Sequence, residues 1–403
     1  MRQPLEGILV LELGMFHAGP GGCAILGDLG AEVIKIEQPG VGDLIRHQKR
    51  IGSIPFELPG GRSLFCEAAN RNKKSITIDL TKKKGQEIAY RLVGKSDVFL
   101  TNMRRPAVEK MKMTYPVLRQ VNPRLIYATV SAFGPNGPYS DRGGFDYQGQ
   151  GMSGMMYSMG EPGPTPGACQ FGIVDQATAI MASHEILTAL YMRERFGTGQ
   201  EVHVSILSSA LWLLYCNVLI AGVAGFDVPR HQRATEFPMR NYYRCSDDLW
   251  FIMTLTPSDR HWGPLCRVLG HPEWEKDSRF DTDDKRFACS KELNEMLDQI
   301  LVTRPRDEWL RIFAENDLFC CPIYKPTDLL KDPQVMQNDY IVDFDHPTLG
   351  RVKIPGYPIH FSESWAGTRS AAPELGEHTE EVLREVGGYT EQEIAQLKAE
   401  KVV

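Results

Sequence analysis

Strand-like runs alternate with helix-like segments through the first half of the chain, and this alternation limits the fold more than any other feature. Short apolar runs are separated by segments in which apolar residues recur at helical spacing. This order is typical of βαβ units, which place parallel strands side by side. The strand-like runs are residues 8–14, 32–37, 74–80, 97–101, 125–131 and 200–207, and the helical segments are 20–29, 84–95 and 176–195. We therefore expect an α/β fold with a large Rossmann-like domain and a mostly parallel sheet.

The pattern changes near residue 225, which indicates a second, smaller α+β domain. Residues 241–255 predict a hairpin with its turn at 246–248, and amphipathic helices are expected at 259–269 and 291–302. Residues 1–224 then form the first part of the large domain and 225–325 the small domain. Residues 326–403 form a proline-punctuated C-terminal segment that ends in two short helices.

Composition excludes several classes of protein. The formal net charge of −6 argues against a nucleic-acid partner, because nucleic-acid binders carry a basic face. The most apolar segment, residues 210–224, contains Asn217 and is too short to span a membrane, so we expect a buried helix there. The nine cysteines have no C-x-x-C spacing, which fits a reducing cytoplasm, and the ten histidines follow no metal-binding pattern. We expect no metal and no tightly bound cofactor.

A glycine-rich segment, Gly19 to Ala24, lies between the first strand and the first helix. Its G-x-G-x-x-A spacing, with Glu37 at the end of the next strand, is typical of dinucleotide sites. Four residues separate it from Gly14, however, and Pro20 lacks the N–H that a phosphate would use. We favour a packing role, in which small residues bring the helix close to the sheet. Another phosphate-bearing ligand at the helix start is the remaining alternative.

Asp175 is the strongest candidate for a reactive residue. It lies at the expected start of a long helix, after a segment rich in Gly, Met and Pro. Most aspartates at helix starts only cap the helix. A carboxylate beside a pliable apolar segment, which includes Met152, Met155, Met156 and Met159, is also suited to covalent catalysis on an activated acyl group. Basic residues near strand ends are either solvated or part of a site; they are Lys35, Lys73, Lys74, Arg104, Arg105 and Lys110.

The chain resembles the class III CoA-transferases, the family of formyl-CoA:oxalate and carnitine CoA-transferases that also contains the α-methylacyl-CoA racemases. The resemblance covers essentially the whole chain. The motifs that carry it are LGMFHAGPGGCAILGDLGAEVIKIEQPGVGD, NRNKKSITIDL, SAFGPNGPYSDRGGFDYQGQGMSG, RFGTGQEVHVSIL and LGEHTEEVLREVGGYTEQEI. The resemblance implies a CoA-binding large domain, an acyl-CoA and a carboxylic acid as substrates, and an intertwined dimer or a heteromer with a paralogous subunit. It also implies that the C-terminal segment returns to the large domain.

The resemblance assigns roles to particular residues. Asp175 corresponds to the family's nucleophilic aspartate, which forms an acyl anhydride and then an aspartyl-CoA thioester. Gln38 stands where formyl-CoA transferase has an adenosine-contacting arginine, and Phe145 and Asp146 fall on a Tyr-Glu pair that lines the reaction site. The positions that match CoA contacts, together with these, are His17, Ala18, Gln38, Ile78, Asp79, Leu80, Thr81, Asn102, Met103, Arg104, Lys110, Phe145 and Asp146.

Two alternatives stay open beside CoA transfer. An α-methylacyl-CoA racemase would need an acid and a base on opposite faces of the α-carbon, and racemases carry a His-Asp pair where this chain has Phe145 and Asp146. A non-catalytic CoA-binding subunit would have no need of Asp175. Within the transferases, the segment HQRATEFPMRNYYRC resembles the branch that acts on aryl-substituted dicarboxylates, with succinyl-CoA as a donor. Arg230, Arg233 or Arg240 could pair a second carboxylate there.

Overall fold

The computed structural model describes residues 2–170 and 172–403, and the chain divides into two compact units. The larger unit contains Met1–Tyr157, Ala168–Asp227 and Asn338–Val403, and the smaller contains Ser158–Gly167 and Val228–Gln337. The sequence placed the boundaries after residues 224 and 325; in the structure the chain enters the smaller unit after 227 and leaves it after 337. The C-terminal segment after 337 is part of the larger unit.

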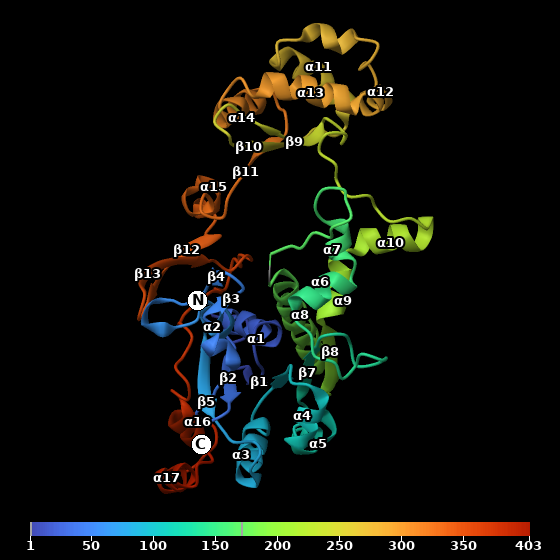
Figure 1. Cartoon of the computed structure of the whole chain (residues 1–403). Coiled ribbons are helices and arrows are strands. Elements are labelled where there is room, and N and C mark those ends of the chain that lie inside the picture. The colour runs from blue at the N-terminus through green and yellow to red at the C-terminus, as the bar shows by residue number, and fades with distance from the viewer. Residues whose placement is uncertain (1, 171) are drawn as a thin grey trace. The chain divides into compact units, whose positions relative to one another are not determined.

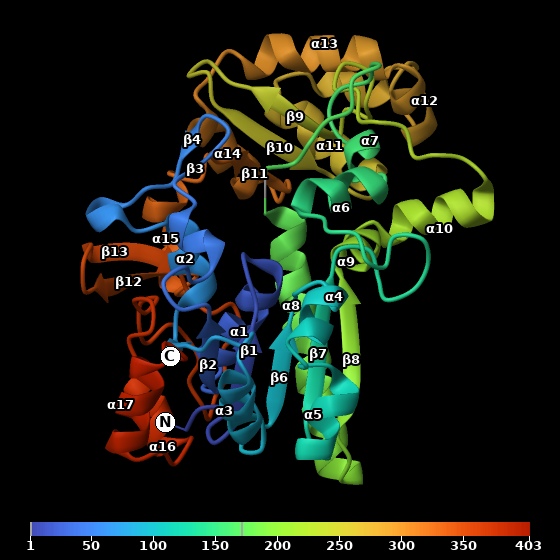
Figure 2. The ribbon, with the colours of Figure 1, turned by 60° about the horizontal axis from the view of Figure 1, so that its bottom comes forward.

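A six-stranded parallel sheet forms the centre of the larger unit (Figure 1). Its order is β5-β2-β1-β6-β7-β8, so the chain moves outward from β1 on one side and from β6 on the other. The strands are β1 (Leu9–Leu13), β2 (Glu32–Glu37), β5 (Lys73–Thr77), β6 (Val98–Thr101), β7 (Ile126–Ser131) and β8 (Gln200–Ser205). β6, β7 and β8 run side by side in Figure 2. The α/β fold expected from the alternating pattern is confirmed, and the junction between β1 and β6 is the point where the strand order reverses.

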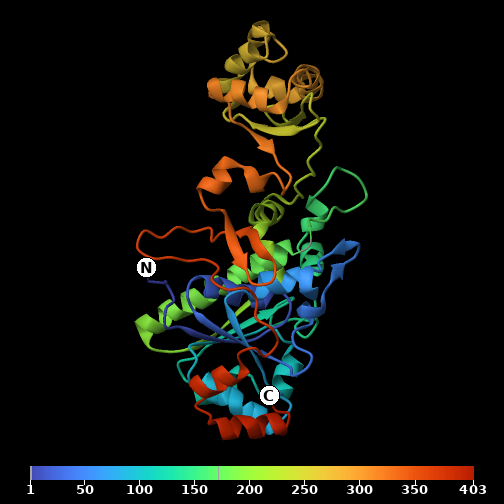
Figure 3. The ribbon, with the colours of Figure 1, turned by 90° about the vertical axis from the view of Figure 1, so that its left-hand side faces the viewer.

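Helices cover both faces of this sheet. Phe99 belongs to one apolar core, whereas the next residue, Leu100, contacts Gly19 on the other face, as the alternation of strand side chains requires. The first core also holds side chains of the two C-terminal helices, which lie beside α3 in Figure 3. The helices of this layer are α3 (Lys83–Val93), α4 (Arg105–Lys110), α5 (Tyr115–Val121), α16 (Thr379–Glu385) and α17 (Glu391–Ala399).

The opposite face is covered by α1 (Ala18–Asp28) and α8 (Ile173–Phe196), which pack tightly on each other. A Cβ added at Gly21 would lie 3.0 Å from the Ala179 Cβ, and one added at Gly22 would lie 3.0 Å from the Ala182 Cβ. A Cβ added at Gly19 would lie 3.1 Å from side-chain atoms of Leu100, in β6, and of Asn102, which follows it. The packing role expected of the glycine-rich segment is therefore confirmed, and the contact extends to α8 as well as to the sheet.

The expectation of a buried helix over residues 210–224 is wrong. Two helices meet at Leu214, α9 (Ile206–Leu213) and α10 (Tyr215–Ala224), with a bend of 75° between them. None of the described residues of α10 is buried, and Val223 is 81% exposed. Among the described residues, no single helix is long and apolar enough to cross a membrane, and only this bent pair reaches the required length and composition. Apolar composition alone does not distinguish a core helix from an exposed apolar face.

Short elements complete the larger unit. The Met-containing segment, expected to be pliable, is largely helical, and Met155 is buried. The remaining elements are α2 (Leu64–Asn70), α6 (Asp146–Met152), α7 (Met155–Ser158), the strand pair β3 (Arg50–Ile51) and β4 (Ile54–Pro55), and the antiparallel pair β12 (Ile341–His346) and β13 (Gly350–Pro355).

The smaller unit is a three-stranded antiparallel sheet, ordered β11-β10-β9, packed against helices. The predicted hairpin is confirmed as β9 (Arg240–Arg244) and β10 (Trp250–Thr254). β11 (Cys320–Ile323) joins them, and the helices are α11 (Ser258–Val268), α12 (Asp283–Ala288), α13 (Ser290–Leu301), α14 (Arg306–Glu315) and α15 (Pro333–Gln337). Its own core contains buried aromatic side chains such as Phe251, Phe280 and Phe313, so the unit has the α+β character that the sequence predicted.

Candidate active site

A cavity of about 1230 Å³ opens at the carboxyl edge of the parallel sheet in the larger unit. It is lined by residues that follow β1, namely Met15 to Ala18, and by residues that follow β6, namely Asn102 to Arg105. Open α/β sheets bind ligands at this point, because the chain leaves neighbouring strands in opposite directions and a crevice remains between them. The cavity is also lined by Asp175, Phe145, the residues after β7 and parts of β7 and β8.

Asp175 lies in the first turn of α8, two residues after its first residue, Ile173. Gly172 precedes the helix in the left-handed conformation, so Asp175 is not the residue that caps it. Burial, and then the nearby charge of Asp146, raise the pKa of the Asp175 carboxyl from its ordinary 3.8 to about 7. A carboxyl group with these properties can be ionised near neutral pH while staying poorly solvated, which suits a nucleophile.

Asp146 caps α8, a role considered for Asp175 from the sequence alone. Its Oδ1 accepts hydrogen bonds from the backbone N–H groups of Val174 (2.7 Å) and Asp175 (3.1 Å). Its Oδ2 accepts one from the Gln150 side chain at 2.6 Å, and the residue is buried. The carboxylate at the start of α8 therefore comes from α6, and it leaves the Asp175 side chain available to the cavity.

His17 stands on the loop between β1 and α1, close to the start of α8. Its Nε2 lies 2.8 Å from the Oε1 of Gln176, the neighbour of Asp175 in sequence, and burial lowers the pKa of the imidazole. The Asn102 side chain joins this loop to the end of β6: its Oδ1 accepts from the Met15 N–H at 2.8 Å and its Nδ2 donates to the Met15 carbonyl at 2.7 Å. His17, Ala18, Asn102, Met103 and Arg104 all line the cavity, as does Asp175.

Two aromatic rings lie next to these groups. Phe16 and Phe145 contact each other edge to face, with ring centroids 5.5 Å apart, and both line the cavity. Such a pair offers an apolar surface to a substrate.

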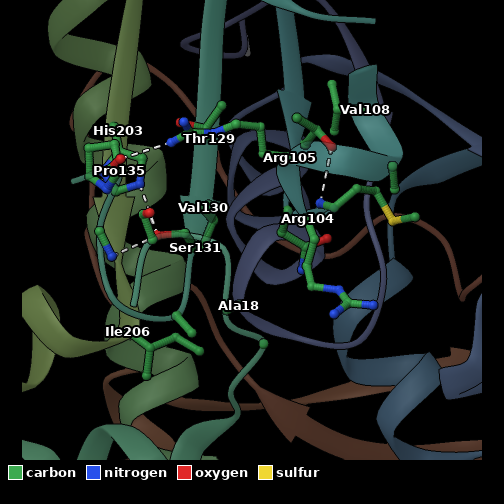
Figure 4. A pocket seen from close by; sticks show the side chains of 18 of the residues that line it. Ala18, Arg104, Arg105, Val108, Thr129, Val130, Ser131, Pro135, His203 and Ile206 are labelled. Carbon is green, nitrogen blue, oxygen red and sulfur yellow. Dashed lines mark hydrogen bonds between the residues drawn. The ribbon is translucent and has the colours of Figure 1, made fainter. Parts of the chain in front are cut away.

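The sequence missed the residues at the far side of the cavity. Figure 4 shows Ser131 beside His203, on the side away from Arg104. The Ser131 Oγ lies 3.0 Å from the His203 Nε2 and accepts from the Gly134 N–H at 3.0 Å, while Arg105 donates to the Pro135 carbonyl at 2.8 Å. Ser131 ends β7 and His203 belongs to β8. Pairing the two predicted strands as parallel neighbours could have indicated from the sequence that these side chains lie close together.

Other predicted residues lie outside this cavity. Gln38 follows β2 and Ile78–Thr81 follow β5, at the same edge of the sheet but on the other side of β1. Ile78 and Leu80 are buried in the core, and Asp79 accepts hydrogen bonds from the N–H and hydroxyl of Thr81. Lys110 is exposed at the end of α4. The described lining also includes none of Met152, Met155, Met156 and Met159.

The three arginines considered for a second carboxylate belong to the smaller unit. Arg233 is committed to Asp298, which accepts from its Nη1 at 2.6 Å, and to the Tyr242 carbonyl. Arg230 donates to the Thr165 carbonyl at 2.7 Å. Arg240 is exposed, with its nearest carboxylate, Glu236, 4.0 Å away. Of the three, Arg240 has the weakest engagement within this unit.

Comparison with known proteins agrees with this geometry. The family model described as CoA-transferase family III matches residues 5–379. The chain belongs to this family. It is 33% identical to the succinyl-CoA–D-citramalate CoA-transferase of Chloroflexus aurantiacus, over 100% of this chain and 98% of that one. It is 31% identical to the cinnamoyl-CoA:phenyllactate CoA-transferase of Clostridium sporogenes, over 98% and 96%. The crystal structure of a CAIB/BAIF family protein from Brucella suis superposes with a TM-score of 0.84 at 31% identity, covering 96% of this chain and 100% of that one. The protein is thus an enzyme of the CoA-transferase class.

Proposed function

We propose that this enzyme transfers CoA from an acyl-CoA donor, such as succinyl-CoA, to a bulky or aryl-substituted carboxylic acid, with Asp175 as the nucleophile. The observation that carries the proposal is the position of Asp175: a half-buried carboxylate with a raised pKa, facing a large cavity at the point where the strand order of the sheet reverses.

The proposed reaction consists of acyl exchanges on one carboxylate. An Asp175 oxygen attacks the thioester carbonyl of the donor, the C–S bond breaks, and a mixed anhydride and CoA thiolate form. The thiolate attacks the aspartyl carbonyl, which releases the donor acid and leaves an aspartyl-CoA thioester. The acceptor carboxylate then attacks that thioester, its C–S bond breaks, and CoA thiolate and a second mixed anhydride form. The thiolate attacks the acceptor's acyl carbon in this anhydride and expels the Asp175 carboxylate. The products are the new acyl-CoA and free Asp175, so every bond broken is replaced.

The cavity lining supports the proposed roles of the other residues. His17, Ala18, Asn102, Met103 and Arg104 would hold the CoA thioester close to Asp175, and Asp146 would position the start of α8. Gln38, Ile78–Thr81 and Lys110 remain proposals that rest on the family resemblance. The Phe16–Phe145 pair favours an acceptor with a ring or another large apolar group. The relative named cinnamoyl-CoA:phenyllactate CoA-transferase likewise has an aryl-substituted acid in its name.

The test of Asp175 uses a second carboxylate of the same helix as control. Asp175→Ala should abolish transfer, and hydroxylamine added with acyl-CoA should modify residue 175 in the wild type only. Glu185→Gln is the matched control, because burial also raises the pKa of Glu185, to about 8, and Glu185 is not among the described residues that line the cavity. If the Asp175→Ala enzyme were as active as the Glu185→Gln enzyme, the assignment of Asp175 as the nucleophile would be wrong.

Phe145 favours transfer over racemisation, because a phenyl ring cannot exchange a proton. With a 2-methylacyl-CoA in deuterated water, the enzyme should introduce no deuterium at the α-carbon. Mass spectrometry measures the incorporation, and rapid incorporation would assign the chain to the racemase branch instead.

We also propose a cytoplasmic enzyme that works as a homodimer, or as a heteromer with a paralogous subunit. The support is the family resemblance and the apolar side chains exposed on α9 and α10, including Trp212, Leu219 and Val223. An apolar face of this kind is usually covered by a partner. Replacing Trp212 and Val223 with serine should shift the sedimenting species toward monomer, and an unchanged dimer would contradict a role for this face.

A further inference from the structure

Four charged side chains are buried beneath the loop that carries His17, and we call them the buried charge cluster: Glu12, Lys35, Asp43 and Lys73. Each is at most 4% exposed. The Glu12 carboxylate accepts from Lys35 and from Lys73, both at 2.6 Å, and the Lys35 Nζ lies 3.0 Å from the Asp43 Oδ2. From the sequence, Lys35 and Lys73 are expected to be either solvated or part of a site. In the structure both are buried, and neither is among the described residues that line the cavity.

Ion pairs with this degree of burial contribute little to stability compared with apolar residues of similar size, because removing the charges from water is costly. The four charges balance one another, so the cluster has no net charge that would attract a ligand. Its presence therefore calls for a role other than simple stabilisation.

The cluster contacts the backbone of the cavity loop at three points along Gly14–Pro20. Lys35 donates to the Gly14 carbonyl at 2.8 Å, Asp43 accepts from the Phe16 N–H at 3.1 Å, and Lys73 donates to the Pro20 carbonyl at 2.8 Å. These bonds fix the beginning, the middle and the end of the segment that presents His17 and Ala18 to the cavity.

The middle contact coincides with backbone strain. Phe16 has a φ of 61°, in the left-handed region that a residue with a Cβ rarely adopts. Such a conformation persists only where the surrounding structure over-determines it. Asp43 on one side and the Asn102 clamp on Met15 supply these constraints.

We propose that the buried charge cluster is a positioning device for CoA transfer, which holds Phe16 in its strained conformation and so keeps His17 next to the start of α8. The four residues touch no substrate and act only through the loop. This inference rests on the proposed role of the cavity beside Asp175, and it adds that the loop geometry, as well as the nucleophile, limits the rate.

Asp43→Asn tests the cluster, with Asp28→Asn as the matched control. An asparagine at 43 has one acceptor oxygen, so it cannot serve both the Lys35 ammonium and the Phe16 N–H. Asp28 is similarly buried and is paired with Arg71 and Asn72, and within the described part of the chain its carboxylate makes no hydrogen bond to the loop. We expect kcat to fall about tenfold to a hundredfold in Asp43→Asn, a loss typical of misplaced reacting groups. Asp28→Asn should lower Tm to a similar extent with kcat within about twofold. Equal losses of kcat at equal Tm would overturn the proposal.

A second pair of variants avoids the buried cluster, should Asp43→Asn fail to fold. Phe16→Gly and Phe16→Val both remove the ring, but only glycine adopts the left-handed conformation without cost, whereas a β-branched residue opposes it. Phe16→Gly should be at least about tenfold more active than Phe16→Val, and Phe16→Gly added to Asp43→Asn should recover part of the lost kcat. Equal activity of the two Phe16 variants would contradict the inference. Since these outcomes do not depend on Asp175→Ala, failure of the positioning role and failure of the nucleophile are distinguishable.

Discussion

At the scale of single residues, two aspartates share the start of α8 and have different environments. Asp146 accepts three hydrogen bonds, whereas none of the residues that the structure describes donates a hydrogen bond to the carboxylate of Asp175. The raised pKa of Asp175 follows from this difference, because burial without donors disfavours the charged form. The hydrogen bonds to Asp146 thus suit it to capping α8, whereas their lack leaves Asp175 with a raised pKa.

Activity should depend on the ionisation of Asp175. Only the carboxylate is a nucleophile, and its pKa of about 7 means that it gains its charge as the pH rises through neutrality. We expect log kcat/KM to rise with pH below about 7 and to level off above it, since kcat/KM reports groups of the free enzyme. Initial rates from pH 5 to 9, with a return to pH 8 to check for irreversible loss, measure this. A flat profile would contradict the assignment.

Stability should respond to the same group in the opposite direction. The folded chain holds the Asp175 proton more tightly than the unfolded chain, so stability falls as the pH rises from about 4 to about 7. Asp175→Asn removes that charge. It should therefore raise Tm at pH 8 and change it little at pH 4, while activity is lost. Calorimetry at the two pH values decides, and an equal shift at both would show that ionisation is not the cause.

At the scale of elements, the contact between α1 and α8 links the His17 loop to the helix that carries Asp175, the proposed nucleophile. The side chains at the crossing are glycines on α1 and alanines on α8, so the two backbones approach closely. His17 and Asp175, the two residues with proposed roles, are at the starts of these helices.

Gly22→Val should separate these helices. Its Cβ would meet Ala182 at 3.0 Å and the Ala179 carbonyl at 3.2 Å, so α8 must shift. Overpacking of this kind costs about 1–3 kcal/mol, and we expect kcat to fall more than the loss of folded protein explains. Gly7→Ala is the control, because a Cβ there meets nothing within 4 Å, although its φ of 87° adds local strain. Denaturant unfolding and kinetics on both variants provide the comparison.

The sequence predicted most strands and long helices of the larger unit because periodicity records which side faces the core. It failed where burial depends on distant groups. The apolar residues of α10, Tyr215–Ala224, are not buried, and Asp146 caps a helix that begins 27 residues later. The candidate site shows the same division. His17 and Asn102 follow predicted strands and Asp175 directly precedes a predicted helix, whereas His203 reaches the cavity through the pairing of β7 with β8.

At the scale of the whole molecule, we expect the cavity to determine which carboxylic acids are good acceptors of CoA. Each methylene buried against the Phe16–Phe145 surface should contribute about 0.8 kcal/mol. With one CoA donor, kcat/KM should therefore decrease from benzylsuccinate to succinate to oxalate. Phe16→Gly should reduce the advantage of benzylsuccinate over succinate. Oxalate equal to or better than benzylsuccinate would show that the cavity does not select apolar acids.

The larger unit is assembled from three separate stretches of sequence, and this has a consequence for its synthesis on the ribosome. Val382, Leu383, Ile394 and Leu397 complete the core that α3 and the first strands begin. The nascent sheet must therefore wait, with an apolar face uncovered, while the whole of 228–337 is translated. The smaller unit draws its core from that one continuous stretch and can fold first. Residues translated after 337 thus complete a core that begins before residue 100, and slow translation of 228–337 would prolong the time for which that apolar face stays uncovered.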